Sequence, residues 1–328
     1  MRRRTVLLAA ALTSGLVAIA GCSAPEEAPK AAAAIDTDTG QTVKINDGPD
    51  QQRIVPAKVD AIANLVPEAI RTKGKLTVGV GAAGAGFPPL AFTATDNKTL
   101  IGSEPDIAVA VAGVLGLEPD LQNTSWENLF IGLDSGKYDL GASNITVTEE
   151  RKQKYDFATY RKDELAFEAK KGSGWKVTGP KDVAGKKIAV GSGTNQEKIL
   201  VEWSEEAVKQ GLPKVDIKYY QTNQATYLAL GSGAIDGYLG PNPTSAYHVA
   251  TAGQTEIVGT YSGAGSTLQG KIAITTKKGS GLVEAYAAAI NELIKSGDYQ
   301  KILDRWNLAN ETVDTSEINP PGLPIEGK

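Results

Sequence analysis

The residues of this chain that could do chemistry stand at two places in the middle of the sequence. Arg151 lies in the charged run Glu149-Glu150-Arg151-Lys152, and its planar guanidinium could bind a carboxylate through two parallel charge-assisted hydrogen bonds. Thr194-Asn195-Gln196-Glu197 is a capping box that predicts a helix N-terminus, where free N–H groups and the helix dipole favour an anion. A solvated surface charge explains Arg151 equally well, and capping alone explains Thr194, so both alternatives stay open.

The single cysteine, Cys22, follows an N-terminal leader. Arg2 to Arg4 are basic, and the apolar stretch from Val6 to Ile19 is too short to cross about 30 Å of hydrocarbon comfortably. The leader ends in Ile19-Ala20-Gly21-Cys22, which resembles the recognition box of bacterial lipoprotein signal peptides. The resemblance implies a signal peptide over residues 1–21, cleavage before Cys22, and acyl chains such as palmitate on the new N-terminal cysteine. Three arginines near the start also raise the twin-arginine export route, but this signal is weak because an ordinary n-region has the same composition.

Charge and cysteine content exclude several classes of site. Removal of Arg2, Arg3 and Arg4 lowers the formal charge from −4 to −7, and no basic stripe is interleaved with aromatic residues, which argues against nucleic acid. One cysteine cannot form a disulfide or a cysteine–zinc cluster within the chain. We therefore expect no nucleic-acid partner, no bound metal and no cofactor, and a mature protein that is a monomer held at the membrane by lipid on Cys22.

Composition divides the mature chain into a tether, a globular part and a tail. Residues 22–51 contain almost no large apolar side chain, so they cannot bury enough surface to offset their ordering entropy and predict a flexible tether. Residues 310–328 include Asn319-Pro320-Pro321-Gly322 and predict an irregular C-terminal tail. The remaining roughly 250 residues suffice for two compact lobes.

Two similar halves are visible in the globular part. Gly74-Lys75-Leu76-Thr77-Val78-Gly79-Val80 resembles Gly185-Lys186-Lys187-Ile188-Ala189-Val190-Gly191, each predicting a turn, a strand and a glycine-rich loop. Later in each half, Leu133-Asp134-Ser135-Gly136-Lys137-Tyr138-Asp139 resembles Leu230-Gly231-Ser232-Gly233-Ala234-Ile235-Asp236, each predicting a helix with a glycine cap and then a strand. Two α/β units in the same order indicate a duplication.

Helical and strand patterns fill the space between these landmarks. Ser103 is expected as the N-cap of one helix, and Thr194 as the N-cap of another that runs to about Gln210. Residues 282–293 and 299–306 predict two further helices, and residues 215–220 a strand. Alternating strands and helices predict mostly parallel sheets, in which a ligand binds outside the carboxyl ends of the strands. The loops after Val80 and Val190 are therefore expected to line a cleft between two lobes.

From Gly74 to Trp306 the chain resembles the family 3 extracellular solute-binding proteins, which serve amino-acid importers of the ATP-binding-cassette class. The resemblance rests on many short segments in the right order. They include Phe87-Pro88-Pro89-Leu90-Ala91-Phe92, Trp126-Glu127-Asn128-Leu129, Ser143-Asn144-Ile145-Thr146-Val147-Thr148-Glu149-Glu150-Arg151, Lys181-Asp182-Val183-Ala184-Gly185, Gly193-Thr194-Asn195-Gln196 and Lys301-Ile302-Leu303-Asp304-Arg305-Trp306.

The resemblance implies a two-lobed periplasmic-binding-protein fold of type II, in which two α/β lobes joined by two crossover strands close on a ligand. On this basis lobe 1 is expected at residues 52–164 plus 266–309, and lobe 2 at residues 165–265. The implied function is that of a lipid-anchored extracytoplasmic receptor that delivers an amino acid, or a derivative of one, to the permease of an importer, without catalysis.

The resemblance also implies roles for individual residues. Arg151 would bind the α-carboxylate of the ligand, with help from neighbouring backbone and side-chain groups, and Asp236 would bind the α-ammonium. Asp139 occupies the same local motif in the first half without an expected ligand role, so part of that motif must be structural. Two aromatic residues would sandwich the ligand side chain, with core packing as the alternative. The implied ligand-binding residues are Phe87, Trp126, Asn144, Thr146, Arg151, Thr194, Asn195 and Asp236.

Two departures from the family pattern bear on the ligand. Asn195 stands where many relatives have a second threonine, which puts that contact in doubt. Several receptors for basic amino acids carry an acid just after the first strand, whereas Gly81-Ala82-Ala83-Gly84-Ala85-Gly86 has no charge. We therefore expect an amino acid that is not basic.

Three other functions are considered. An exported dehydratase of prephenate-type substrates on the same fold would need a positioned acid or base in the cleft, and the single histidine, His248, is expected on a helix of lobe 2 as a surface or satisfied residue. Dinucleotide binding at Gly191-Ser192-Gly193 lacks the third glycine of the fingerprint. A ligand sensor that reports to a signalling partner stays open.

Overall fold

The computed structural model describes residues 34–36, 42–84 and 86–325, with side chains from residue 45 onward. The predicted signal peptide, Cys22 and most of the predicted tether lie outside the described residues. No helix in the described part of the chain is long and apolar enough to cross a membrane.

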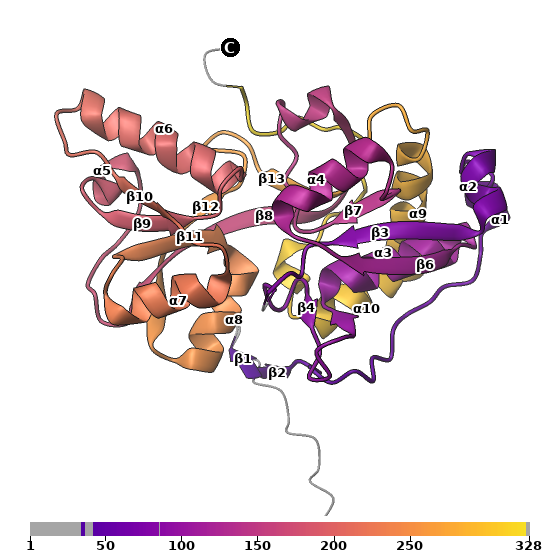
Figure 1. The fold of residues 1–328 in the computed structure, drawn as a ribbon, viewed down its shortest axis with the longest axis horizontal. Helices are drawn as coiled ribbons and strands as arrows, with labels where there is room; N and C mark the ends of the chain where they lie inside the picture. The colour runs from indigo at the N-terminus through magenta and orange to yellow at the C-terminus, as the bar shows by residue number, and fades with distance from the viewer. Residues whose placement is uncertain (1–33, 37–41, 85, 326–328) are drawn as a thin grey trace, which may run out of the picture. The chain divides into compact units, whose positions relative to one another are not determined.

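Parallel strands flanked by helices form the centre of the molecule (Figure 1). Within the described residues, nine strands form one hydrogen-bonded sheet in the order β10-β9-β11-β8-β13-β7-β3-β6, with β12 paired to β8. These strands are β3 (Lys75–Val80), β6 (Glu118–Asn123), β7 (Leu140–Ala142), β8 (Tyr155–Lys170), β9 (Lys187–Val190), β10 (Asp216–Tyr219), β11 (Gly237–Pro241), β12 (Thr255–Ser262) and β13 (Gly270–Lys277). Two short antiparallel pairs are β1 (Ala34–Asp36) with β2 (Thr42–Lys44), and β4 (Phe92–Thr93) with β5 (Leu100–Ile101).

The long strand β8 belongs to both halves of this sheet. Its first half pairs with β13, and β3 lies parallel to both β6 and β7, which makes lobe 1. Its second half pairs with β11 and β12, and β9 lies parallel to both β10 and β11, which makes lobe 2. The two halves therefore repeat one arrangement of three parallel strands, as the internal sequence similarity predicts.

Helices cover both faces of the sheet in each lobe (Figure 1). In lobe 1 they are α1 (Asp60–Ala63), α2 (Glu68–Lys73), α3 (Ser103–Leu115), α4 (Trp126–Ser135), α9 (Val283–Ser296) and α10 (Asp298–Arg305), with the 3-10 turns η1 (Arg151–Gln153) and η2 (Ala309–Glu311). In lobe 2 they are α5 (Pro180–Val183), α6 (Asn195–Lys209), α7 (Asn223–Ser232) and α8 (Asn242–Ala252).

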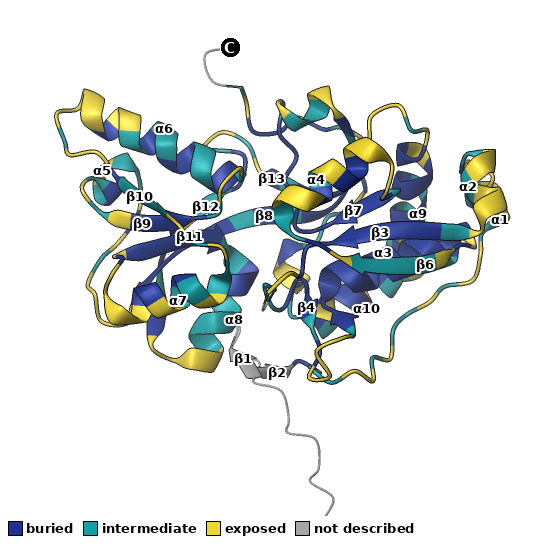
Figure 2. Ribbon diagram, in the orientation of Figure 1, coloured by how far each residue is buried: buried dark blue, intermediate teal, exposed yellow. Residues whose placement is uncertain are grey.

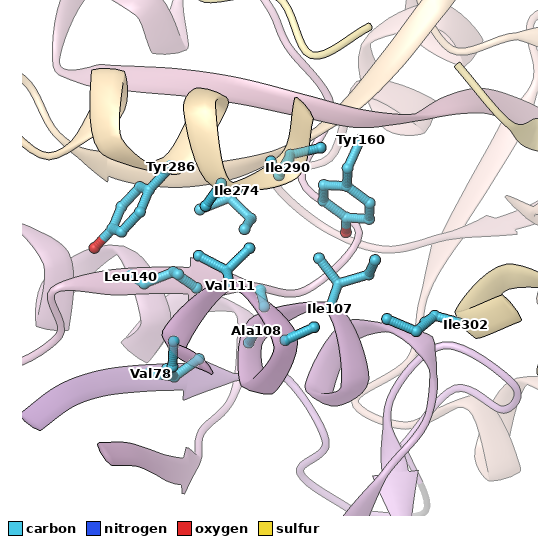
Figure 3. Packing of buried hydrophobic residues seen from close by; sticks show 14 of the residues in the cluster. Val78, Ile107, Ala108, Val111, Leu140, Tyr160, Ile274, Tyr286, Ile290 and Ile302 are labelled. Carbon is cyan, nitrogen blue, oxygen red and sulfur yellow. The ribbon is translucent and has the colours of Figure 1, made fainter. Parts of the chain in front are cut away.

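The core of lobe 1 has two layers because successive strand residues point to opposite faces of a sheet. On one face, Ile107 and Val111 of α3 pack with Val78, Leu140 and Ile274 of the strands (Figure 3). On the other face, α4 packs against a separate cluster that contains Ile145, Phe157 and Ala273. Both faces are buried, which is why these strands are apolar without strict alternation.

Lobe 2 repeats this two-layer arrangement. Ile188 and Val190 of β9 pack with α6, whose Trp203 stacks on Phe167 with ring centroids 5.5 Å apart. Between them in the strand, Ala189 faces a second cluster under α7. Strand β9 is therefore held from both sides, and its carboxyl end is fixed in space.

The residues expected to cap helices predict one helix start correctly and another incorrectly. The amide of Glu197 donates to Oγ1 of Thr194 (3.2 Å), and α6 ends at Lys209, as the capping box predicts. The prediction of Ser103 as an N-cap is wrong, because Gly102 takes that position with φ of 124° and a Cβ there would lie 2.2 Å from the oxygen of Leu90. Ser103 begins the helix itself and is fully buried.

The two ends of the described chain are packed more closely than composition predicts (Figure 2). Ile45, within the predicted tether, is 1% exposed and belongs to the core of lobe 1, so the fold begins before residue 52. The predicted tail has little regular structure, yet Ile318 pairs with Ala158 of β8, and Leu323 belongs to the core cluster of lobe 2. The last residues therefore contact both lobes.

Candidate functional site

A pocket of about 260 Å³ lies where the carboxyl ends of the parallel strands of both lobes meet; we call it the central pocket. Its walls come from the last residues of the six parallel strands, three in each lobe, or from the segments that follow them. They are Gly81, Ala83, Gly86 and Phe87 after β3, Thr124 to Glu127 after β6, Ser143 and Asn144 after β7, Gly191, Ser192 and Thr194 to Gln196 after β9, Tyr219 to Asn223 at the end of β10, and Tyr238 to Pro241 in β11. This is where an α/β sheet places a ligand.

Three helices begin at the walls of the central pocket. Ser125 caps α4, Thr194 caps α6 and Thr222 caps α7, each accepting one backbone amide at 3.2 to 3.3 Å. The cap satisfies one N–H, and the other amides of a first turn have no partner within their helix. The pocket therefore collects unpaired N–H groups and positive dipole ends from both lobes, which suits a carboxylate.

Rings and neutral polar groups make up most of the pocket wall. Phe87, Trp126, Tyr219, Tyr220 and Tyr238 contribute the rings. Among the described lining residues, Glu127 is the one with a formal charge, and it is exposed. The lining thus offers hydroxyls, amides and aromatic surface, with a single carboxylate for a cation.

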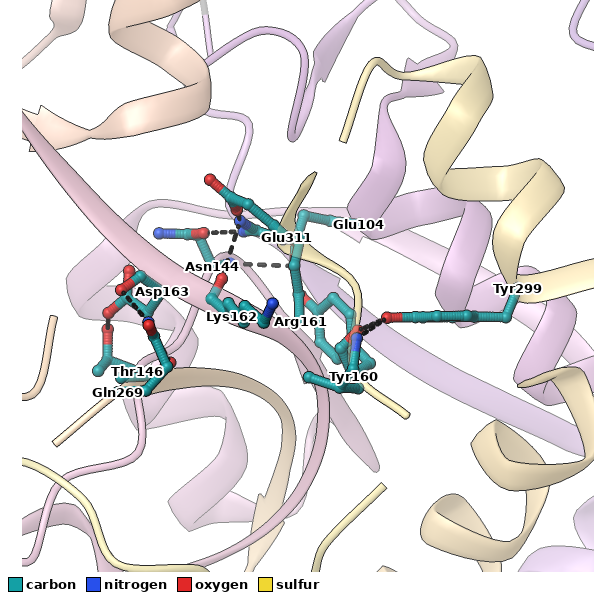
Figure 4. A network of polar contacts seen from close by, with 12 residues as sticks. Glu104, Asn144, Thr146, Tyr160, Arg161, Lys162, Asp163, Gln269, Tyr299 and Glu311 are labelled. Carbon is teal, nitrogen blue, oxygen red and sulfur yellow. Dashed lines mark hydrogen bonds and ion pairs between the residues drawn. The ribbon is translucent and has the colours of Figure 1, made fainter. Parts of the chain in front are cut away.

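Asn144 is held in the pocket wall by a buried polar network (Figure 4). It adopts a left-handed backbone (φ 50°), which asparagine tolerates better than most residues, and its amide donates to Oε2 of Glu104 (3.0 Å). Its side-chain oxygen accepts from Arg161, which also pairs with Glu311 and lies 3.7 Å from Glu104. Arg161, Glu104 and Glu311 are each at most 1% exposed.

The network contains more acid than base. Burial raises the pKa of Glu104, and burial raises the pKa of Glu311 to about 7 even though Arg161 lies against it. Burial also opposes the charge on Arg161, but the carboxylates of Glu311 and Glu104 outweigh it and raise its pKa. Arg161 therefore stays positively charged at neutral pH, whereas Glu311 binds a proton at near-neutral pH.

Asp163 joins the two lobes directly behind the pocket. Its Oδ2 accepts from Oγ1 of Thr146 in lobe 1 (2.7 Å) and from Nδ2 of Asn195 in lobe 2 (3.2 Å). Nδ2 of Asn195 also donates to the oxygen of Gly263 (3.0 Å). Burial raises the pKa of Asp163, and the hydrogen bond from Thr146 opposes that shift. Thr146 and Asn195, both predicted as ligand residues, thus share one buried carboxylate.

Arg151 lies on the other side of the Thr194–Asn195 wall. It lines a separate pocket of about 710 Å³, together with Lys154 and Lys198, and not the central pocket. Its guanidinium donates to the oxygens of Thr146 (2.9 Å) and Gly193 (3.1 Å), and it stacks 5.0 Å from the ring centre of Trp126. Burial lowers its pKa to about 10, so it stays cationic at neutral pH.

Asp236 lies at the opposite end of β11 from the central pocket. It is exposed, and its Oδ2 accepts from the amide of Lys187 (2.8 Å) at the start of β9. Asp139 makes the same contact with the amide of Thr77 (2.9 Å) in the first half of β3. The shared motif therefore ties neighbouring strands together, and the structure does not bring Asp236 and Arg151 to two ends of one ligand.

The predicted site residues consequently fall into three groups. Phe87, Trp126, Asn144, Thr194 and Asn195 line the central pocket. Thr146 is buried behind it, and Arg151 and Asp236 lie outside it. Cys22 lies outside the described residues.

Sequence reasoning missed Thr222 and Asn223, although the internal repeat contains the signal. Thr222 precedes its glycine cap Gly233 by the same interval that separates Ser125 from Gly136. Asn223 therefore corresponds to Trp126, which was predicted from its own motif. No group of three or more His, Cys, Asp or Glu side chains in the described chain is placed to hold a metal ion.

Comparison with known proteins is consistent with this geometry. Residues 76–309 match the family model described as bacterial extracellular solute-binding proteins, family 3. The arginine-binding protein ArgT of Corynebacterium glutamicum is 31% identical over 274 residues, which cover 83% of this chain and 87% of that protein. The L-cystine-binding protein TcyJ of Escherichia coli is 31% identical over 244 residues, 74% of this chain and 86% of that protein.

Solved structures share the fold. The amino-acid ABC transporter substrate-binding protein AbpA of Streptococcus pneumoniae, solved with L-arginine bound, is similar with a TM-score of 0.62 at 27% identity, covering 74% of this chain and 99% of that one. An ancestral arginine-binding protein bound to arginine gives a TM-score of 0.61 at 30% identity, covering 71% and 98%. The predicted two-lobed periplasmic-binding fold of type II is thereby confirmed.

Proposed function

Because the chain belongs to family 3 of the bacterial extracellular solute-binding proteins, we propose that it is a lipid-anchored receptor that captures a non-basic amino acid in the central pocket and delivers it to the permease of an ABC importer. Solute binding and an extracytoplasmic location follow from the family. The ligand class, the anchor and the roles of single residues are the proposal.

The observation that carries the proposal is the make-up of the central pocket. Unpaired amides at the start of α4, α6 and α7 can receive the α-carboxylate, which every free amino acid presents. Phe87 and Trp126 offer apolar ring surface for the side chain. Groups from both lobes then contact one ligand, so binding favours the conformation that keeps them together.

Charge counting supports a non-basic ligand. The α-ammonium needs one carboxylate, and Glu127 is the carboxylate that the described lining supplies. A second cation on the side chain would lack a counter-charge there, although cation–π contacts with the rings would compensate part of that loss. The names of the relatives point both to arginine and to L-cystine, and the lining favours a ligand without net charge.

Arg151 has an indirect role in this proposal. Its bond to the oxygen of Gly193 holds the loop that leads into Thr194, and its charge lies one wall away from the proposed carboxylate position. Asp236 is not included, because its carboxylate already binds the amide of Lys187 at the far end of the strand. Lipid attachment at Cys22 rests on the leader sequence alone.

A binding screen tests the proposal. The full-length protein is titrated calorimetrically with the common amino acids and with L-cystine, and a ligand at about 100 times its dissociation constant should also add about 2.7 kcal/mol to the stability. Glu127→Gln should weaken binding of the true ligand, and Asp236→Asn serves as the matched control. If the protein binds L-arginine more tightly than every neutral amino acid, the proposal of a non-basic ligand is wrong. If it binds none of the compounds tested, the proposal of amino-acid binding is wrong.

The same sample separates a receptor from an enzyme on this fold. The ligand should be recovered chemically unchanged after prolonged incubation with the protein. Conversion of prephenate or arogenate during such an incubation would identify a dehydratase instead.

A further inference from the structure

A second cavity of about 270 Å³ adjoins the central pocket; we call it the distal chamber. Its walls come from the loop after β3 in lobe 1 and from helices α7 and α8 in lobe 2. The lining residues are Gly86, Pro88, Asn223, Gln224, Tyr227, Thr244, Tyr247, His248 and Thr251. None of these described residues is an Asp, Glu, Lys or Arg, so histidine is the one titratable group other than tyrosine.

Asn223 stands between the two cavities. Asn223 of lobe 2 and Gly86 of lobe 1 line both cavities. Nδ2 of Asn223 donates to the oxygen of Gly86 (3.1 Å). Its Oδ1 accepts from the hydroxyl of Tyr238, which also lines the central pocket (3.3 Å). A single amide side chain thus forms the threshold, and it can offer hydrogen bonds to a molecule that passes it.

His248 is held rigidly in the wall of the distal chamber. Its Nδ1 lies 2.5 Å from Oε1 of Glu168, which is fully buried in β8 and also accepts from Oγ1 of Thr255 (2.6 Å). The imidazole is stacked on the ring of Tyr227, 3.5 Å away and nearly parallel. A carboxylate beside Nδ1 fixes the proton on that nitrogen and fixes the ring orientation.

The other ring nitrogen is left for a ligand. Nε2 of His248 has no hydrogen-bond partner within the described chain, and the side chain keeps 20% of its surface exposed. The same wall contains two buried hydroxyls without a described partner, on Thr244 and Tyr227. Buried polar groups at a cavity are usually satisfied by bound water or by a ligand.

We propose that the binding cleft continues past Asn223 into the distal chamber, and that the protein binds an elongated amino acid whose far end presents an N–H or O–H hydrogen-bond donor to Nε2 of His248. This inference rests on the proposed function and specifies its ligand class. The α-carboxylate end occupies the central pocket, the middle of the ligand crosses the threshold, and the rings of Tyr227 and Tyr247 flank the far end.

Two probes of different length test the chamber. L-cystine has a second ammonium group at its far end, which can donate to Nε2 of His248, whereas S-methyl-L-cysteine has the same near end and stops after the sulfur. Calorimetric titration of the full-length protein should show that L-cystine binds at least about tenfold more tightly than the short probe, the effect of one or two added hydrogen bonds.

Two variants then locate the far-end contact. His248→Asn keeps an amide near the position of Nδ1, facing Glu168, but has no atom at the position of Nε2. Thr251→Phe leaves the His248–Glu168 pair intact and narrows the chamber from its exposed rim. Both should lower the affinity for L-cystine about tenfold and change the affinity for S-methyl-L-cysteine by less than about twofold.

The outcomes distinguish this inference from the proposed function. The proposal that the distal chamber binds the far end of the ligand would be wrong if wild-type protein bound only the short probe. It would also be wrong if the variants lowered the affinity for both probes equally or for neither. Amino-acid binding in the central pocket would stand in each case. Wild-type protein that binds no amino acid at all would overturn both.

Discussion

Replacement of Glu311 by glutamine should remove the contribution of this one buried carboxyl to the pH dependence of stability. Glu311 is 1% exposed and pairs with Arg161, yet burial raises its pKa from the ordinary 4.5 to about 7. The folded protein therefore holds this proton to higher pH than the unfolded chain does. Its contribution to the free energy of unfolding is largest below pH 4.5 and is lost progressively as the pH rises to 7, by about 3 kcal/mol in total.

Urea denaturation at several pH values from 4.5 to 8, followed by tryptophan fluorescence, measures this effect. At the acidic end Glu311 is protonated and neutral, so Glu311→Gln is expected to be about as stable as wild type there. The variant should then become more stable than wild type by about 3 kcal/mol towards pH 8, because only the wild type then carries an additional buried charge. Glu317→Gln is the matched control, since Glu317 lies in the same segment but is 42% exposed in its pair with Lys271. Parallel pH curves for wild type and Glu311→Gln would refute the reasoning.

Substitutions at four further positions separate binding from folding. Asp236→Ala and Asp139→Ala should each cost about 1 kcal/mol in denaturation experiments, because each loses a bond to a strand amide, while the calorimetric affinity for ligand stays unchanged. Trp126→Ala should weaken ligand binding by about tenfold or more, since it removes ring surface from the pocket, and Trp126→Phe should recover part of that loss. Gly263→Ala places a Cβ 1.7 Å from Oδ2 of Asp163, so it should cost about 1 to 3 kcal/mol in stability and also weaken binding; unchanged affinity would show that Asp163 does not position the pocket.

Much of the fold could be predicted because its signals are local. The strands after Gly74 and Gly185, the cap at Thr194 and the terminal helices all follow from a few neighbouring residues. The internal repeat then extends this information, since equivalent strands must end at the same edge of each sheet. The five predicted residues that line the central pocket were identified in this way or by family resemblance.

The rest of the site depends on contacts between distant parts of the chain. Arg161 and Glu311 are 150 residues apart, and nothing local to either indicates that both are buried. Asp236 illustrates the reverse error, because its motif is clear but serves the strand and not the pocket. Acidic residues such as Glu104 also look like ordinary first-turn helix residues until the sheet places Tyr160 and Arg161 against them.

The C-terminal segment has a consequence for how the lobes can move. Ile318 pairs with β8, whereas Leu323 is buried in lobe 2 and the oxygen of Pro324 accepts from Lys198 of α6 (2.5 Å). The chain thus passes between the lobes a third time, beside β8 and the segment that joins β12 to β13. Two crossings leave relative bending and twisting free, but a third that is anchored on both sides resists twist. Opening should therefore follow a single bending coordinate, and deletion of the last residues should add torsional freedom that spectroscopic distance measurements between the lobes would detect as a broader distribution.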